Sequence, residues 1–127
     1  MSAATKAGGF WHASVRLRDH ERILRSEGAF ASPFHFAGRL YLTNERLIWV
    51  PMRILPLIGV ALGTALSIEL SDVEECTTGK RVFGAPHRPV YVRTSYGLRD
   101  FLIGMRYTTL SVAEWIDSIQ AARSATR

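Results

Sequence analysis

The stretch from Gly38 to Pro51 reads Gly-Arg-Leu-Tyr-Leu-Thr-Asn-Glu-Arg-Leu-Ile-Trp-Val-Pro. Two short apolar runs, Leu40–Leu42 and Leu47–Val50, flank a polar turn at Thr43–Arg46. Apolar runs separated by a few turn-forming residues are typical of a β-hairpin. Asparagine tolerates a left-handed backbone better than most residues. We therefore expect a hairpin here, with Asn44 able to take a left-handed conformation in its turn.

Alternation of apolar and polar residues predicts further strands around this hairpin. Leu40 and Leu42 share one face of the first hairpin strand, and Tyr41 lies on the other, which is the period of a half-buried strand. Alternation also predicts strands at Ser67–Ser71, Val90–Thr94 and Arg99–Ile103, with a turn at Tyr96-Gly97 between the last two. Before the hairpin, we expect a short helix over Val15–Arg25 that runs into a first strand near Ile23–Ala31. Several short strands with regular turns predict a small barrel or sandwich.

The end of the chain changes period and predicts one amphipathic helix of about three turns. Val112, Trp115, Ile116 and Ile119 follow the spacing of a single apolar helix face. Ser111 and Glu114 fit a capping box, in which Ser111 is the N-cap, and Leu110 and Trp115 fit a hydrophobic staple. This apolar face can close the open mouth of a small barrel.

Composition places all of this in one domain. The chain has 127 residues, 47% of them apolar, which suffices for a single core. We expect a flexible leader at 1–12, in which Phe10 and Trp11 dock on the domain or meet a membrane or partner, one domain at 13–123, and a tail at 124–127. One cysteine, Cys76, no secretory signal and no apolar run of membrane-spanning length indicate a reducing cytoplasmic setting.

The hairpin, the strands and the terminal helix resemble the GRAM branch of the pleckstrin-homology-like superfamily. The resemblance extends over Gly38–Ala122 and is carried by Gly38–Trp49, by Ile-Glu-Leu-Ser-Asp-Val at Ile68–Val73, and by Trp115-Ile116. It implies a mainly β (α+β) fold, a small β-barrel of two packed antiparallel sheets capped by one C-terminal α-helix. It also implies a non-catalytic binding module for phosphoinositides, other anionic lipids or proteins.

Pleckstrin-type lipid sites often place Lys and Arg around the first hairpin loop. In this chain the corresponding stretch, Glu27–Gly38, contains neither residue type, and Arg39 only borders it. The resemblance therefore does not by itself select a phosphoinositide, and binding residues have to be sought elsewhere in the chain.

The first candidate site is the uncharged segment Ile54–Leu66. It is too short to span a bilayer, and its Pro and Gly residues argue against a regular helix. Three interpretations remain open: a core strand with its connection, an interface for an oligomer or partner, and a shallow membrane loop. In the last two, Leu57 and Leu62 would make the contact, and Arg53 beside them could meet a lipid phosphate.

The second candidate site is the basic stretch Lys80–Arg88, in which Lys80, Arg81 and Arg88 surround Phe83. Such a stretch can bind an anionic lipid surface or an acidic partner protein, or it can be a solvated loop between strands. Basic residues with an aromatic side chain can also grip a nucleic acid, but nucleic acid is the least favoured partner here.

Catalysis and metal binding find no support in the residue spacings. The four histidines show no metal-ligand spacing, and neither a nucleophile elbow nor a phosphate-binding loop occurs. We expect no enzyme activity and no cofactor. With a net charge of +5, the chain is interpreted as an adaptor or a module that binds peripherally at an anionic membrane. The alternative is a self-assembling or partner-binding domain that uses residues 54–66.

Overall fold

The structure is a computed structural model, and it describes residues 6–7, 14–31, 36–55, 60–61, 65–78, 90–103 and 109–126. Seven of its strands form one antiparallel sheet, in the order β8-β5-β4-β3-β11-β10-β9. These strands are β3 (Ile23–Ala31), β4 (Phe36–Thr43), β5 (Arg46–Pro51), β8 (Leu66–Glu69), β9 (Val73–Thr78), β10 (Val90–Thr94) and β11 (Gly97–Ile103). Two small sheets pair β1 (Lys6–Ala7) with β2 (Val15–Arg16), and β6 (Arg53–Leu55) with β7 (Val60–Ala61). The 3-10 turn η1 (Leu70–Asp72) and the helix α1 (Thr109–Ala125) complete the fold.

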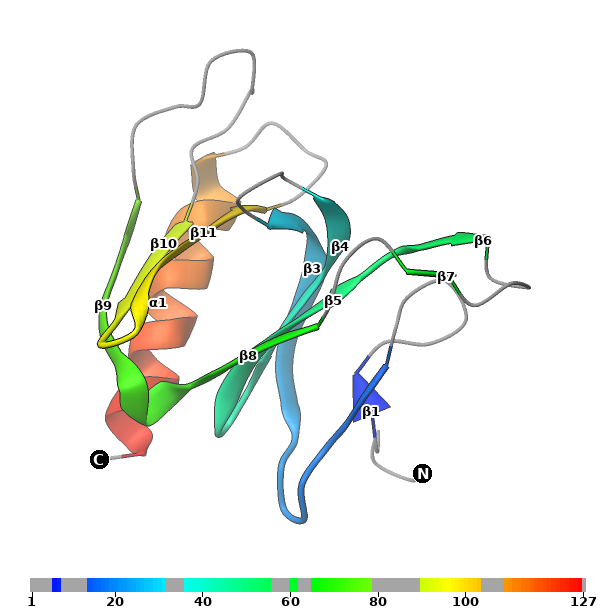
Figure 1. Cartoon of the computed structure of the whole chain (residues 1–127). Helices are drawn as coiled ribbons and strands as arrows, with labels where there is room; N and C mark the ends of the chain where they lie inside the picture. Colours follow the sequence, from blue (N-terminus) through cyan, green and yellow to red (C-terminus); the bar gives the residue numbers. More distant parts are fainter. Residues whose placement is uncertain are drawn as a thin grey trace.

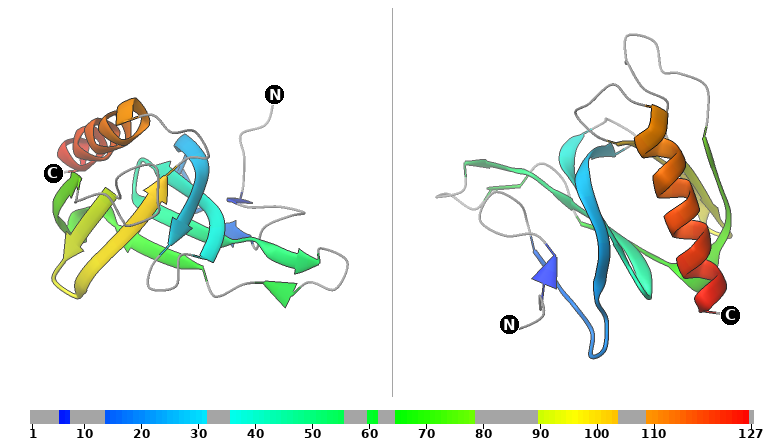
Figure 2. Two further views of the ribbon diagram at one scale, coloured as in Figure 1. Left: turned by 90° about the horizontal axis from the view of Figure 1, so that it is seen from above. Right: turned by 180° about the vertical axis from the view of Figure 1, so that it is seen from behind.

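The seven-stranded sheet is strongly curled and α1 lies along its concave side (Figures 1 and 2). Strand β3 pairs with β4 on one side and with β11 on the other, so the two halves of the sheet are hydrogen-bonded into one. The outer strands β8 and β9 are joined by η1 but are not paired with each other in the described residues. The mainly β fold with one C-terminal helix is thus confirmed. The predicted barrel of two packed sheets is not confirmed, because the main strands in the described part of the chain form one open sheet.

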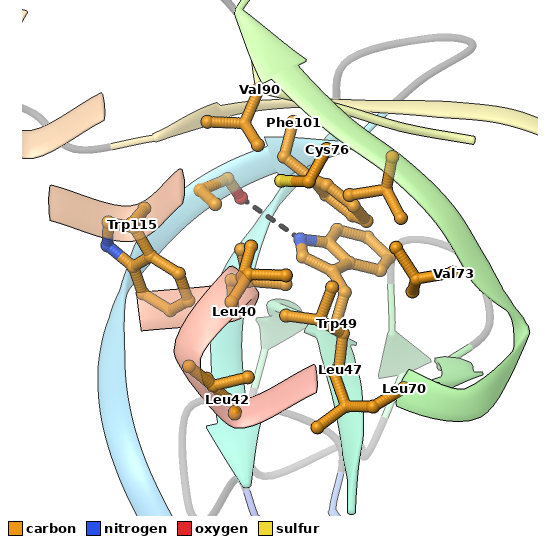
Figure 3. Close-up of a cluster of buried hydrophobic side chains, with 14 of the residues drawn as sticks. Leu40, Leu42, Leu47, Trp49, Leu70, Val73, Cys76, Val90, Phe101 and Trp115 are labelled. Atoms are coloured by element: carbon orange, nitrogen blue, oxygen red, sulfur yellow. Dashed lines mark hydrogen bonds between the residues drawn. The ribbon is translucent and has the colours of Figure 1, made fainter. Parts of the chain in front are cut away.

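The main core fills the space between the concave face and α1 (Figure 3). Leu40 and Leu42 are fully buried there, as the alternation predicts. The predicted helix stripe is confirmed, because Trp115 and Ile119 are fully buried and their stripe neighbours pack on the same core. Trp49 also enters this core, and its indole N–H donates to the carbonyl oxygen of Ala29 at 3.0 Å. That bond satisfies the one polar group of a buried ring.

Gly38 makes the close packing of Trp49 possible. A β-carbon at position 38 would collide with the carbonyl oxygen of Val50 and with the indole ring of Trp49. Only glycine lets the hairpin strands approach so closely at this point, because any side chain would displace either the ring or the neighbouring backbone.

A second, smaller core covers the outer face of the β4–β5 hairpin. Ala7 and Leu17 from the N-terminal segment pack there against Ile48 and Val50. All six residues of β5 are therefore buried, so this strand is covered on both faces rather than half-buried. Part of the segment predicted as a leader contributes to this cover through β1, whereas Phe10 and Trp11 lie outside the described residues.

The predicted helix over Val15–Arg25 is wrong. Val15 pairs with Ala7 in the small β1–β2 sheet, and β3 begins at Ile23. Between them the chain reverses at His20, whose φ is +67°. A helix would have removed Glu21 from its buried partner Arg46, so tertiary contacts override the local pattern of this segment.

Two predictions about turns and caps are also wrong. Among the described non-glycine residues only His20 has a positive φ, so Asn44 is not left-handed. Instead its side-chain oxygen accepts from the Arg22 N–H at 2.7 Å and its amide donates to the His20 carbonyl at 3.2 Å. The helix begins at Thr109, which places Ser111 inside the first turn rather than at the N-cap, and α1 runs for 17 residues.

Most of the predicted strands are confirmed. Strands β3 and β10 have the predicted bounds, and β11 begins two residues earlier than expected. The turn before it lies at Ser95–Tyr96, and Gly97 opens the strand with a φ of +137°. The predicted strand at Ser67–Ser71 ends at Glu69 because the chain turns into η1, and β9 was not predicted.

Candidate functional site

The strand register sorts the connections of the sheet into two ends. Pro51 pairs with Gly38, and Val90 pairs with both Phe101 and Thr78, so these residues lie at one end. The connections 32–35, 52–65, 79–89 and 104–108 all leave from it, and we call it the loop end. The connections 17–22, 44–45, 70–72 and 95–96 leave from the opposite end, which we call the turn end. The two predicted sites therefore belong to connections at the same end.

Charge is divided unequally between these two sets of connections. Those of the loop end contain five cationic residues and no carboxylate, namely Arg53, Lys80, Arg81, Arg88 and Arg106. Those of the turn end contain four carboxylates and two arginines, namely Asp19, Glu21, Glu45 and Asp72 with Arg18 and Arg22. Because fields from like charges add, a set of connections with one sign of charge attracts counter-ions and anionic partners.

The apolar segment at the loop end forms a small sheet of its own. Strands β6 and β7 pair with each other, with Arg53 opposite Ala61 and Leu55 opposite Val60. Figure 1 shows this pair beyond the end of β5, away from α1 and from β9–β11. Leu66, the last residue of the segment, instead begins β8 and packs on the main core. The described residues of the segment thus include most of a projecting strand pair and one partly buried residue, Leu66, that packs on the main core.

The structure places the predicted site residues only in part. Arg53 opens β6, and its side chain lies outside the described residues. Leu57, Leu62, Lys80, Arg81, Phe83 and Arg88 also lie outside them. What the register establishes is the common end from which their connections leave, and the prediction that they form one binding surface stays a prediction.

The turn end is built around a buried ion pair between Glu21 and Arg46. The Nε and Nη2 atoms of Arg46 donate to the two carboxylate oxygens of Glu21 at 2.8 and 3.0 Å. Thr43 Oγ1 donates to the same carboxylate at 2.6 Å, and the Arg18 N–H donates to it at 2.8 Å. Arg46 also donates to the Arg16 carbonyl at 2.9 Å. This network fastens the N-terminal segment to the β4–β5 hairpin.

The network fixes the charge of Glu21. Burial opposes ionisation of this carboxyl group, but the hydrogen bonds from Arg46, Thr43 and Arg18 outweigh it and lower its pKa to about 2. A buried carboxylate with a forked arginine partner and further donors is the arrangement in which a buried charge is tolerated. Glu21 therefore stays ionised and serves the fold.

Arg18 adds a partly exposed ion pair on the outside of the same end. Its guanidinium contacts both carboxylate oxygens of Glu69, one of them at 3.0 Å, and reaches Glu45 at 3.5 Å. The hydrogen bond with Glu69 raises the pKa of Arg18, and the same bond lowers the pKa of Glu69. Exposed pairs contribute little to stability, so Arg18 tightens a junction that Glu21 already holds.

The described residues offer little for covalent or metal chemistry. Among them no group of three or more His, Cys, Asp and Glu side chains is placed to hold a metal ion. Cys76 is buried in the main core, and burial raises the pKa of its thiol to about 11, so the reactive thiolate is disfavoured. In the described part of the chain, no helix is long and apolar enough to cross a membrane.

Sequence reasoning missed Arg106 at the loop end and the Glu21–Arg46 pair at the turn end. Arg106 follows β11, whose end becomes a neighbour of the β9–β10 connection only through the sheet register. Glu21 and Arg46 are separated by 25 positions. Their only local signal is a threonine three residues before the arginine. Both features depend on long-range pairing, which local periodicity does not encode.

Comparison with known proteins bears on the fold. No family model matches the sequence, and no curated protein matches it. Solved structures do match it, among them the following two. The C-terminal domain of an unknown protein from Leishmania infantum aligns with a TM-score of 0.58 and 15% identity, over 80% of this chain and 87% of that one. The Vps36 N-terminal PH domain aligns with a TM-score of 0.56 and 14% identity, over 83% of each chain.

The fold is pleckstrin-homology-like. This agrees with the superfamily resemblance of the sequence. At such low identity the alignment concerns the course of the backbone and carries no ligand with it. Within a pleckstrin-homology-like fold, binding has to be argued from the residues that this chain places at each end of the sheet.

Proposed function

We propose that this chain is a non-catalytic binding module that docks on an anionic membrane surface through its loop end. The observation that carries the proposal is the charge division between the two ends. Four connections leave from the loop end with five cationic residues and no carboxylate. At the turn end, by contrast, Arg18 and Arg46 are held by carboxylates of the protein itself.

The electrostatic free energy expected from each cation favours binding to an anionic surface rather than in a single headgroup pocket. Each Lys or Arg close to an anionic bilayer contributes about 1 kcal/mol, so several of them together give useful affinity without a specific headgroup site. Stable peripheral binding usually needs a second contribution besides charge. The projecting β6–β7 pair and the uncharged residues between its strands can supply it by entering the interfacial region.

Membership of the GRAM branch is part of this proposal. The sequence motifs at Gly38–Trp49 and Ile68–Val73 support it. In the structure these motifs form the β4–β5 hairpin and the turn from β8 through η1. Both are structural elements, and neither lies in the cationic connections. GRAM membership thus predicts the scaffold and the binding class, while the loop-end residues of this chain set its ligand.

Vesicle co-sedimentation tests the proposal with the unmodified protein. We expect binding to vesicles of phosphatidylcholine with phosphatidylserine, and much weaker binding to phosphatidylcholine alone. Binding should fall as salt rises, since the screening length shortens from about 10 Å at 0.1 M to about 3 Å at 1 M. Equal binding to neutral vesicles, or binding that salt leaves unchanged, would contradict an electrostatic surface.

A second function is favoured by one observation, the separate β6–β7 sheet. A projecting apolar strand pair also suits contact with another copy or another protein. Replacing Leu57 and Leu62 with Glu separates the two functions. A folded variant that changes from oligomer to monomer in light scattering supports the protein contact. A folded variant of unchanged mass that loses only vesicle binding supports the membrane, and failure to fold contradicts both.

A further inference from the structure

Strand β8 has an open edge. It pairs with β5 on one side, and no strand in the described part of the chain pairs with its other side. The Leu70 N–H donates to the Glu45 carbonyl at 3.0 Å, and Ile68 lies opposite Leu47 in the same register. Because backbone groups alternate in direction along an antiparallel strand, Ile68 and Leu66 bond toward β5. Ser67 therefore directs its N–H and carbonyl groups to the open edge, and Glu69 directs its N–H there, whereas the Glu69 carbonyl accepts the first bond of η1 as its N-cap.

The other outer strand of the sheet is protected. Along β9, the Glu74 carbonyl accepts from Arg123 Nη2 at 2.9 Å, and the Cys76 carbonyl accepts from Gln120 Nε2 at 3.4 Å. Both donors belong to α1, which therefore satisfies acceptors that would otherwise attract another strand. Unprotected edges are templates for pairing with another chain. The difference singles out β8 as the edge at which this fold can accept one.

A groove of about 210 Å³ runs beside the open edge of β8. One wall consists of β8 and Asp72, and the other is the β10–β11 turn with Tyr96 and Arg99. Tyr96 is 87% exposed, and Arg99 is exposed with no ion-pair partner among the described residues. Gly97 between them has open space where a β-carbon would be. The groove therefore joins a free strand edge to an aromatic ring and an unpaired cation.

We propose that this groove binds an extended peptide segment of a partner protein, which adds to the edge of β8 as a strand and presents a carboxylate to Arg99. Main-chain bonds to an exposed edge give affinity in this mode of recognition, and side-chain contacts give specificity. The Arg99 guanidinium suits a carboxylate in forked geometry. The β10–β11 turn forms the opposite wall of the groove. A second copy would have to bring a full sheet with its own β8 against this wall, whereas a single extended segment would not, so we favour the segment.

A peptide scan with a proline variant tests this proposal. The probe is a set of fluorescent, acetylated octapeptides of alternating Val and Thr in which one Glu is moved through all positions. We expect at least one to bind and to slow amide exchange at Ser67 and Glu69. The variant Ser67→Pro removes the outward N–H and leaves the bonds to β5 intact. It should bind that peptide about tenfold more weakly than Ser67→Ala, which equally loses the contact from Arg46.

Methylated peptides give a second measurement that does not depend on folding of the proline variant. Methyl groups on alternate peptide nitrogens should abolish binding in one phase and spare it in the other, because only every second N–H faces β8. Equal binding by Ser67→Pro and Ser67→Ala, insensitivity to methylation phase, or no binding by any peptide would overturn the proposal. So would a dimer that Ser67→Pro dissolves, since the occupant would then be a second copy. None of these outcomes involves the loop end, so the membrane proposal is tested separately.

Discussion

The loop end and the turn end of the sheet use charge in opposite ways. At the turn end, Glu21 and Arg46 are buried and bonded to each other, and Arg18 is held by Glu69 and Glu45. At the loop end, five cations lie in connections that contain no carboxylate. At the turn end, charges join the N-terminal segment to the hairpin, whereas we propose that the charges of the loop end serve to bind a ligand. Changes at the two ends should therefore affect different measurements.

Both ends depend on the core between them, which gives the largest expected effect. Trp115→Ala removes a fully buried ring that also donates to Glu27 at 3.4 Å. Truncation of a buried aromatic side chain lowers the free energy of unfolding by about 3–5 kcal/mol. We expect such a loss in chemical denaturation, with vesicle binding reduced only in proportion to the unfolded fraction. A loss below about 1 kcal/mol would mean that α1 does not close the core.

The variant Glu21→Ala breaks the turn end alone. It leaves the Arg46 guanidinium buried without its partner, and breaking a buried ion pair in this way costs about 3–5 kcal/mol. Unfolding measured by circular dichroism should show this loss, while vesicle binding of the folded protein stays unchanged. Arg18→Ala is the matched control, because its ion pairs are partly exposed and should be worth less than about 1 kcal/mol. Equal effects of the two variants would contradict the distinction between them.

Acid should weaken the turn end in a defined range. The pKa of Glu21 is about 2 in the folded protein against 4.5 for the free group, so its contribution is complete above 4.5 and is lost as pH falls toward 2. The difference corresponds to roughly 3 kcal/mol. Glu69, whose pKa is also lowered, contributes in the same direction. In Glu21→Gln the fall in unfolding free energy over this range should be much smaller, and an unchanged fall would assign the acid sensitivity to other groups.

The sequence predicts the parts of the fold whose signal is local. Alternation located β10, and the spacing of Val112, Trp115 and Ile119 located the helix face. These patterns arise because each element buries one face against the same core. The superfamily resemblance added the pleckstrin-homology-like architecture, which periodicity alone leaves open.

The remaining features depend on contacts between distant residues. Val15–Arg25 has apolar spacing compatible with a helix. It is extended instead, because Val15 pairs with Ala7 and Glu21 forms an ion pair with Arg46. Asparagine favours turns in any sequence. Only the structure shows that the Asn44 side chain accepts from the Arg22 N–H and donates to the His20 carbonyl. The charge division between the ends likewise needs the strand register, because the connections that share an end are far apart along the chain.

Two triple charge reversals of equal net charge test the central claim most directly. In one variant Lys80, Arg81 and Arg88 of the loop end become Glu. In the control Arg16, Arg22 and Arg99, which are exposed away from the loop end, become Glu. If the loop end is the binding surface, the first variant should lose at least about 3 kcal/mol of affinity for phosphatidylserine vesicles, at about 1 kcal/mol per lost cation before repulsion of the new carboxylates. The control should keep most of its binding. Equal loss in both would show that net charge alone drives the association, and undiminished binding by the first variant would contradict the account.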